Sequence, residues 1–180
     1  MRIPLSLPRK MNGQPSMGKI TFGDLLELFP QLELPLFLDD ESASLFSQNN
    51  DPFPGELFDA MLRPLLPDDD EYTEYVPCFR ISQDEYHALV IWKASLLTYE
   101  YLMLIFDKKG QFLSSERIGG MLVRDDQLFR RVAHFDEEGI IHIAEGATDL
   151  SERFDPKESN TYEIEILPNG EIYSSRSKLN

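Results

Sequence analysis

The sequence predicts an α+β fold: a strongly curved antiparallel β-meander of about seven or eight strands, with two short N-terminal helices covering part of one face. From Tyr72 onward, segments rich in Val, Ile, Tyr and Phe follow one another at short intervals, as is typical of strands. Glycine-containing turn signals separate several of them, and two apolar patterns of helical spacing precede them. We therefore expect a single domain over 19–180, with a helical and irregular cover over 19–71 and the sheet over 72–176.

The first 18 residues contain several prolines and glycines without periodicity, so we expect a flexible tail over 1–18. A helix is expected to begin at Thr21, because Asp24 stands three residues later, at the position of a capping-box acid. Apolar residues at 25, 26, 28 and 29 form its buried stripe. Pro30 ends this first helix.

Residues 32–53 look irregular, apart from an extended piece in which leucines alternate over 32–38. A second helix is expected from about Pro54 to Arg63, because proline suits the first helical turn and apolar residues recur at helical spacing after it. The acidic run over 68–71 then predicts a solvated turn.

Eight strands are predicted in the rest of the chain, over 74–81, 85–94, 97–107, 111–119, 127–135, 140–145, 161–167 and 171–176. The segment 85–94 is apolar on both faces, which predicts a central strand covered on both sides. The segment 161–167 alternates apolar residues with glutamates, which predicts a half-exposed strand near an edge.

Three turn signals set the register of the predicted sheet: Asp107–Gly110, Asp136–Gly139 and Leu167–Gly170. An Asp at the first turn position can accept a backbone hydrogen bond, and Gly at the fourth supplies a positive φ. In such three-residue loops the residues that flank the loop face each other. The expected apolar pairs are Phe106 with Phe112, Phe135 with Ile141, and Ile166 with Ile172. The spacing of the glycines also leaves a propeller of repeated blades open.

The charge of the chain limits its partners. It has 32 acidic and 17 basic residues, for a formal net charge of −15. This charge disfavours nucleic acids and anionic membrane surfaces, whereas cations and basic protein faces remain possible partners. With one cysteine, no segment of signal-peptide character and no long apolar run, we expect a cytoplasmic protein.

The predicted register places His134 directly opposite His142 across the Asp136–Gly139 hairpin. Two imidazoles at that separation could share a metal ion, with Asp136 or Glu145 as a third ligand. The alternative is an ordinary pair of polar residues on a solvated sheet face, since no recognised metal-ligand motif accompanies them.

The remaining chemical signals are weak. Cys78 has neither a nearby base nor a helix N-terminus in its local sequence, which favours a buried structural cysteine. The acidic runs 39–41 and 68–71 lack the ligand spacing of a calcium loop. Phosphate-binding glycine loops and nucleophile elbows are absent from the sequence, and nothing in it indicates a cofactor. Early aromatic residues, with Tyr101 expected to face Arg117, fit either a binding surface or core packing.

Four stretches carry a resemblance: LLELFPQLELPL (25–36), NDPFPGELFDAMLRPLL (50–66), YVPCFRI (75–81) and HALVIWKASLL (87–97). Together they resemble a family of small bacterial proteins of Bacteroidetes type that has no assigned activity. The resemblance therefore gives no residue a role.

Three functions remain open. The sequence favours a non-catalytic interaction protein with a basic partner, such as an inhibitor or immunity-type protein. The alternatives are a hydrolase or metal-binding enzyme that uses His134 and His142, and a small-ligand sensor whose ligand lies between the helical cover and the sheet.

Overall fold

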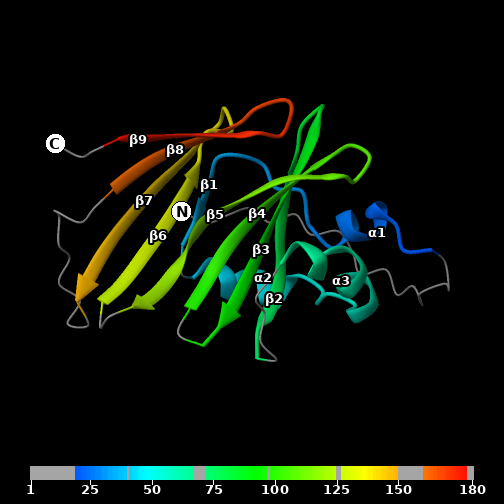
Figure 1. The fold of residues 1–180 in the computed structure, drawn as a ribbon, viewed down its shortest axis with the longest axis horizontal. Coiled ribbons are helices and arrows are strands. Elements are labelled where there is room, and N and C mark those ends of the chain that lie inside the picture. The colour runs from blue at the N-terminus through cyan, green and yellow to red at the C-terminus, as the bar shows by residue number, and fades with distance from the viewer. Residues whose placement is uncertain are drawn as a thin grey trace.

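The computed structural model describes residues 19–39, 41–66, 72–96, 98–124, 127–149 and 160–177. Its main feature is one antiparallel sheet in which eight strands follow the order of the chain, with a short ninth strand beside it (Figure 1). The sheet is not closed and a few short helices accompany it, so the predicted α+β meander is confirmed. The predicted tail over 1–18 and the predicted turn over 68–71 lie outside the described residues.

The strands of the meander match the predicted segments closely. They are β2 (Glu74–Ser82), β3 (Tyr86–Ser95), β4 (Thr98–Asp107), β5 (Phe112–Arg124), β6 (Gln127–Phe135), β7 (Ile141–Asp149), β8 (Asn160–Ile166) and β9 (Ile172–Ser177). Two strands are longer than predicted, because β5 continues through Gly119 and Gly120 and β7 continues along β6 to Asp149.

The three predicted hairpins are confirmed in turn and register. Gly110, Gly139 and Gly170 have φ angles of 83°, 86° and 80°, the left-handed conformation that glycine adopts without strain. In the first turn, the Asp107 carboxylate accepts hydrogen bonds from the backbone N–H groups of residues 109 and 111, both at 2.8 Å. Asp136 does the same in the second turn. The expected flanking pairs, 106 with 112, 135 with 141 and 166 with 172, all face each other.

Helices α1 (Phe22–Glu27) and α3 (Gly55–Met61) are the two predicted ones, and a 3₁₀ turn, η1 (Arg63–Leu65), follows α3. The side chain of Thr21 accepts from the backbone N–H of Asp24 at 3.3 Å, and the Asp24 carboxylate accepts from the backbone N–H of Thr21 at 2.8 Å. The expected capping box is therefore present. None of the helices in the described part of the chain is long and apolar enough to span a membrane.

Strand β1 (Leu36–Leu38) lies within the extended piece predicted over 32–38, but its pairing with β6 was not predicted, and neither was helix α2 (Ser42–Asn49). The Asp39 carboxylate accepts from the backbone N–H groups of residues 41 and 42, at the start of α2. The helix then packs on β2, where the rings of Phe46 and Phe79 lie 5.7 Å apart. Its sequence carries few apolar residues, so its stability depends on this packing.

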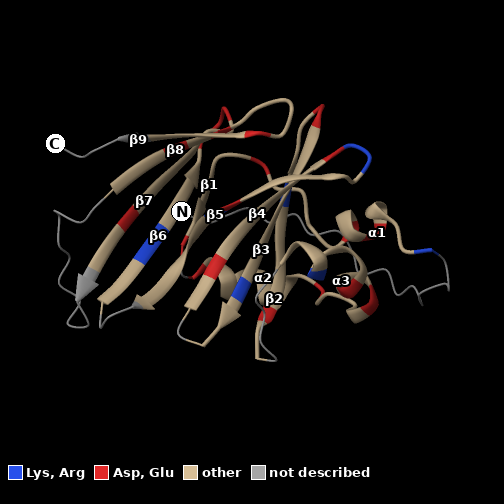
Figure 2. Ribbon diagram, viewed as in Figure 1, with Lys and Arg blue, Asp and Glu red and all other residues tan. Residues whose placement is uncertain are grey.

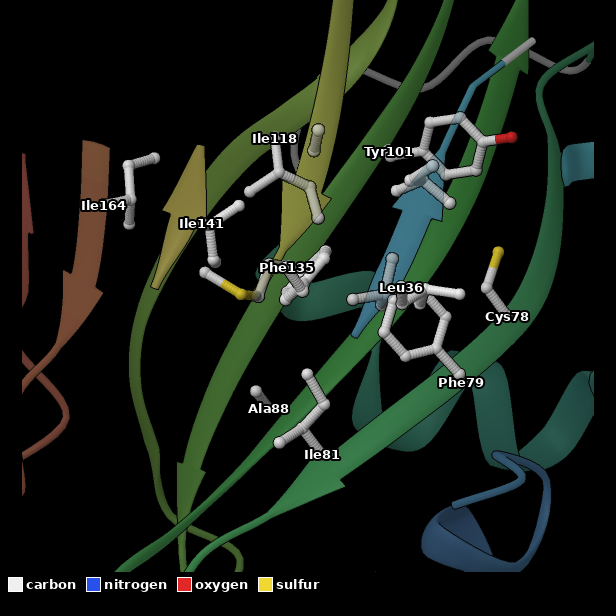
Figure 3. Packing of buried hydrophobic residues seen from close by; sticks show 14 of the residues in the cluster. Leu36, Cys78, Phe79, Ile81, Ala88, Tyr101, Ile118, Phe135, Ile141 and Ile164 are labelled. Atoms are coloured by element: carbon white, nitrogen blue, oxygen red, sulfur yellow. The ribbon is translucent and has the colours of Figure 1, made fainter. Parts of the chain in front are cut away.

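The sheet separates two apolar clusters. On one face of β3 and β4, side chains of α1, α3 and η1 cover Leu89, Ile91, Leu104 and Phe106. On the other face, Figure 3 shows side chains from β1 through β8 directed into a common interior. Because β2 and β8 lie near opposite ends of the strand order yet share this interior, the sheet must curl around it. The strand β3 is buried on both faces, as predicted.

β5 and β6 are paired only between Gly120–Arg124 and Gln127–Arg131. Beyond this point β5 continues beside β4, whereas β6 pairs with β1, from Leu36 opposite Phe135 to Leu38 opposite Ala133. We call the place where the two strands separate the fork.

The predicted pairing of Tyr101 with Arg117 is wrong. Tyr101 lies opposite Gly119, and Arg117 lies opposite Leu102, because β5 contains two extra residues, Leu113 and Ile118, that each shift the register by one. The Tyr101 side chain is buried, and its hydroxyl donates to the backbone carbonyl of Asp39 at 2.9 Å. It therefore belongs to the core and not to a binding surface.

Candidate functional site

Exposed carboxylates gather at one end of the sheet. Successive antiparallel strands reverse direction, so the turns β2–β3, β4–β5, β6–β7 and β8–β9 lie at the same end. Three of these four turns are acidic and β4–β5 carries Lys108 and Lys109, as Figure 2 shows. We call the following residues the acidic hairpin end: Asp84, Glu85, Asp136, Glu137, Glu138, Glu165 and Glu171.

Acidic residues from two separate hairpins of this end lie close enough to the Tyr86 hydroxyl to raise its pKa. Burial raises the pKa of the Tyr86 hydroxyl, and the charges of Glu85 and Glu165 raise it further. One of these glutamates lies in the β2–β3 turn and the other in β8. The β8–β9 turn also contacts β5, where the Ser114 hydroxyl donates to the Gly170 carbonyl at 2.6 Å. The charges of the β2–β3 turn and of β8 therefore act on the same group at this end of the sheet.

The histidine pair has the predicted register, with His134 directly opposite His142. Their rings stack with centroids 6.1 Å apart, and Phe37 of β1 lies on the other side of His134 at 6.3 Å. The Nε2 atom of His142 is 2.9 Å from a carboxylate oxygen of Asp136. This hydrogen bond is the main cause of the lowered pKa of the Asp136 carboxyl.

Of the two acids expected to complete a metal site, Asp136 lies beside the pair, but Glu145 does not. Side chains alternate along a strand, so position 145 of β7 faces away from position 142. Glu145 instead accepts from Arg131 at 2.7 and 2.8 Å. Within the described residues, no group of three or more His, Cys, Asp or Glu side chains is arranged to hold a metal ion.

A row of alternating charges crosses the sheet farther from the turns (Figure 2). Lys93, Glu100, Gly120, Arg131 and Glu145 face one another in sequence across β3 to β7. Opposite charges in neighbouring cross-strand positions stabilise a sheet modestly. At Gly120 the row has no side chain.

A shallow depression of about 180 Å³ lies at this gap, next to the fork. Its polar and glycine lining comprises Arg117, Gly119, Gly120, Arg130, Arg131 and Glu145. The sequence offered no signal for this site, since residues on three strands meet there only through the register. Buried apolar side chains pack between the helical cover and the sheet, where the alternative of a small-ligand sensor would place its ligand.

A hydrogen-bonded serine and histidine were also missed by the sequence reasoning. Ser82 lies opposite His87 in the β2–β3 hairpin, and its hydroxyl oxygen is 2.7 Å from the His87 Nδ1 atom. Burial, followed by the charges of Lys108 and Arg80, lowers the pKa of His87. A neutral imidazole can accept a proton from a hydroxyl. However, the depression is lined by residues of β5, β6 and β7, so Ser82 and His87 do not belong to it.

Comparison of the chain with protein-family models, with curated proteins and with solved structures gives no match. Function is therefore inferred from the geometry of the molecule.

Cys78, Asp39 and Tyr86 have structural positions in the fold. The Cys78 thiol is fully buried, and burial raises its pKa strongly, which disfavours the reactive thiolate. Asp39, in the first acidic run, binds the backbone at the start of α2. Among the early aromatics, Tyr86 is buried whereas Tyr72 is exposed.

Proposed function

We propose that the protein is a non-catalytic interaction protein that binds a basic protein partner through the acidic hairpin end. The observation that carries the proposal is the position of exposed carboxylates on three turns at one end of the sheet, in a chain with a net charge of −15. Complementary charge speeds association and selects partners.

The β6–β7 turn holds one of these charges, that of Asp136, in a fixed position. Asp136 accepts backbone hydrogen bonds within its own turn, at 3.0 Å from residue 138 and 2.9 Å from residue 140. A preorganised surface loses little conformational entropy when it binds. This supports the more specific hypothesis of an inhibitor or immunity-type protein whose acidic turns enter the basic active site of its partner.

The test compares two variants that remove the same charge from different places. The hairpin variant carries Asp84→Asn, Glu85→Gln, Glu137→Gln and Glu138→Gln. The control variant carries Glu27→Gln, Glu33→Gln, Glu41→Gln and Asp51→Asn, four exposed acids away from the sheet turns. Wild type, hairpin variant and control are immobilised and exposed to native lysate at low and at moderate salt.

We expect wild type and control to retain the same basic protein, and the hairpin variant to bind it at least about tenfold more weakly in a subsequent titration. The weakening should shrink as salt rises, because salt screens exposed charges. Recovery of no stable partner at either salt concentration, or equal binding by the two variants, would contradict the proposal.

The histidine pair favours a second candidate function, the binding of a divalent transition metal. His134 and His142 lie opposite each other on one hairpin, and Asp136 already contacts His142 at 2.9 Å. A metal ion would take the place of the proton in that hydrogen bond, and both imidazoles would have to rotate from their stacked orientation. Two imidazole nitrogens and one carboxylate suit zinc, nickel or iron.

A further inference from the structure

The depression at the fork differs in charge from the rest of the molecule. Three arginines and one glutamate line it, in a chain that carries almost twice as many acidic as basic residues. Two buried glycines, Gly119 and Gly120, also line it. Both features arise where β5 leaves β6.

The two arginines nearest the fork are held differently. Arg131 binds Glu145 at 2.7 and 2.8 Å, donates to the Arg117 carbonyl at 2.6 Å and lies over the Tyr162 ring. Its side chain is 16% exposed. Arg117 is 36% exposed, and its contacts to Glu100 and Glu145 are long, at 3.4 and 3.9 Å. Arg131 is therefore fixed, whereas the guanidinium of Arg117 can exchange one carboxylate for another.

The remaining wall of the depression is apolar and consists of Met121, Leu122 and Phe129. A guanidinium beside an apolar wall is suited to a carboxylate whose other end is hydrophobic. We propose that the depression binds a small monocarboxylate with an apolar or aromatic group, whose carboxylate pairs with Arg117 in place of Glu100 while its apolar group packs against Leu122 and Phe129.

The charge balance selects a singly charged ligand over a polyanion. Glu100, Glu116 and Glu145 all lie within ion-pair distance of Arg117 or Arg131. These three acids pair with the two arginines, so little net positive charge remains for a phosphate dianion. The site lies away from the acidic hairpin end and does not depend on a basic protein partner.

The test uses benzoate as the probe, with acetate and inorganic phosphate for comparison. Each is titrated into the full chain at constant ionic strength, and the backbone amide signals of Gly119 and Gly120 are followed by ¹⁵N NMR. We expect benzoate to shift both signals saturably, with a Kd of about 5 mM or lower. Acetate should bind at least about tenfold more weakly, because it has no group for the apolar wall.

Two substitutions separate the parts of the site. Arg117→Gln should weaken benzoate at least about tenfold, since it removes a charge-assisted bidentate contact. Arg63→Gln is the matched control, because Arg63 also forms an ion pair with a carboxylate but lies on the helical cover, and benzoate affinity should not change. Leu122→Ala tests the wall without touching the arginine, and should weaken benzoate but not acetate.

Non-saturating shifts, equal affinity in Arg117→Gln and wild type, or tighter binding of phosphate than of benzoate would overturn the proposal. If Arg117→Gln does not fold, the benzoate affinities of Leu122→Ala and Arg117→Lys test the proposal instead. Arg117→Lys keeps the charge but loses the two-pronged contact, so unchanged benzoate affinity in both variants would also overturn it.

Discussion

At residue 120 the backbone has a φ of +130°, and a Cβ atom there would collide with the carbonyl oxygen of Tyr99. Glycine is needed for two independent reasons, the backbone angle and the close approach of β4 to β5. Both reasons concern the packing of β5 against the backbone of β4, at the point where the charged row crosses these two strands.

Gly120→Ala should lower the free energy of unfolding by about 2 kcal/mol or more, because it adds steric overlap and backbone strain. Urea denaturation followed by Trp92 fluorescence measures the change. Gly55→Ala is the control, since a Cβ at the start of α3 meets nothing within 4 Å. Equal losses in the two variants would show that the sheet tolerates a side chain at position 120.

The histidines allow a clean test of metal binding, because the chain has three of them and one lies outside the pair. At about ten times the Kd, Zn²⁺ or Ni²⁺ should stabilise the wild type by about 1.4 kcal/mol in thermal unfolding. His134→Gln and His142→Gln should each abolish the effect. His87→Gln should retain it, because His87 binds Ser82 in another hairpin. An equal effect in all three variants, or no thermal shift in the wild type, would remove this candidate.

At the scale of elements, the parts of the fold that could be predicted are those fixed by nearby residues. The three hairpins follow from Asp, Asn and Gly within each turn, and the capping box of α1 follows from two residues three apart. The pairing of β1 with β6, helix α2 and the extra residue at Ile118 could not be predicted, because partners far along the chain stabilise them. For the same reason the histidine register was predictable within one hairpin, whereas the depression between three strands was not.

The β6–β7 turn should make a specific contribution to acid stability. The pKa of Asp136 is lowered from its ordinary value of 3.8, mainly by the hydrogen bond with His142. A carboxyl whose pKa is lower when folded contributes stability above pH 3.8, and this contribution is lost as the pH falls below that value. Asp136→Asn should therefore reduce the fall in stability at acid pH, as measured by urea midpoints across the pH range.

Asp107→Asn is the control, since Asp107 makes the equivalent backbone hydrogen bonds in the β4–β5 turn without the histidine. If both substitutions flatten the acid limb to the same degree, the contribution belongs to the turn geometry and not to the His142 contact.

At the scale of the whole molecule, the net charge of −15 opposes the compact state through self-repulsion. Raising the ionic strength from about 0.01 to 0.15 M shortens the screening length from about 30 to 8 Å. The thermal midpoint, measured by circular dichroism, should therefore rise with NaCl, and should rise less in the hairpin variant. A fall would mean that the favourable ion pairs of the charged row outweigh the repulsion.

The pairing of β1 with β6 has a consequence for the order of assembly during synthesis. Leu36 faces Phe135, so the earlier strand leaves the ribosome about a hundred residues before its partner exists, and contacts at such separations form slowly. Once β6 has been synthesised, its segment from Ala133 to Phe135 has an unpaired edge until β1 docks on it. Unpaired edges of this kind recruit other chains. A nascent protein in which β6 has formed but β1 has not yet paired with it is therefore the species most prone to aggregation.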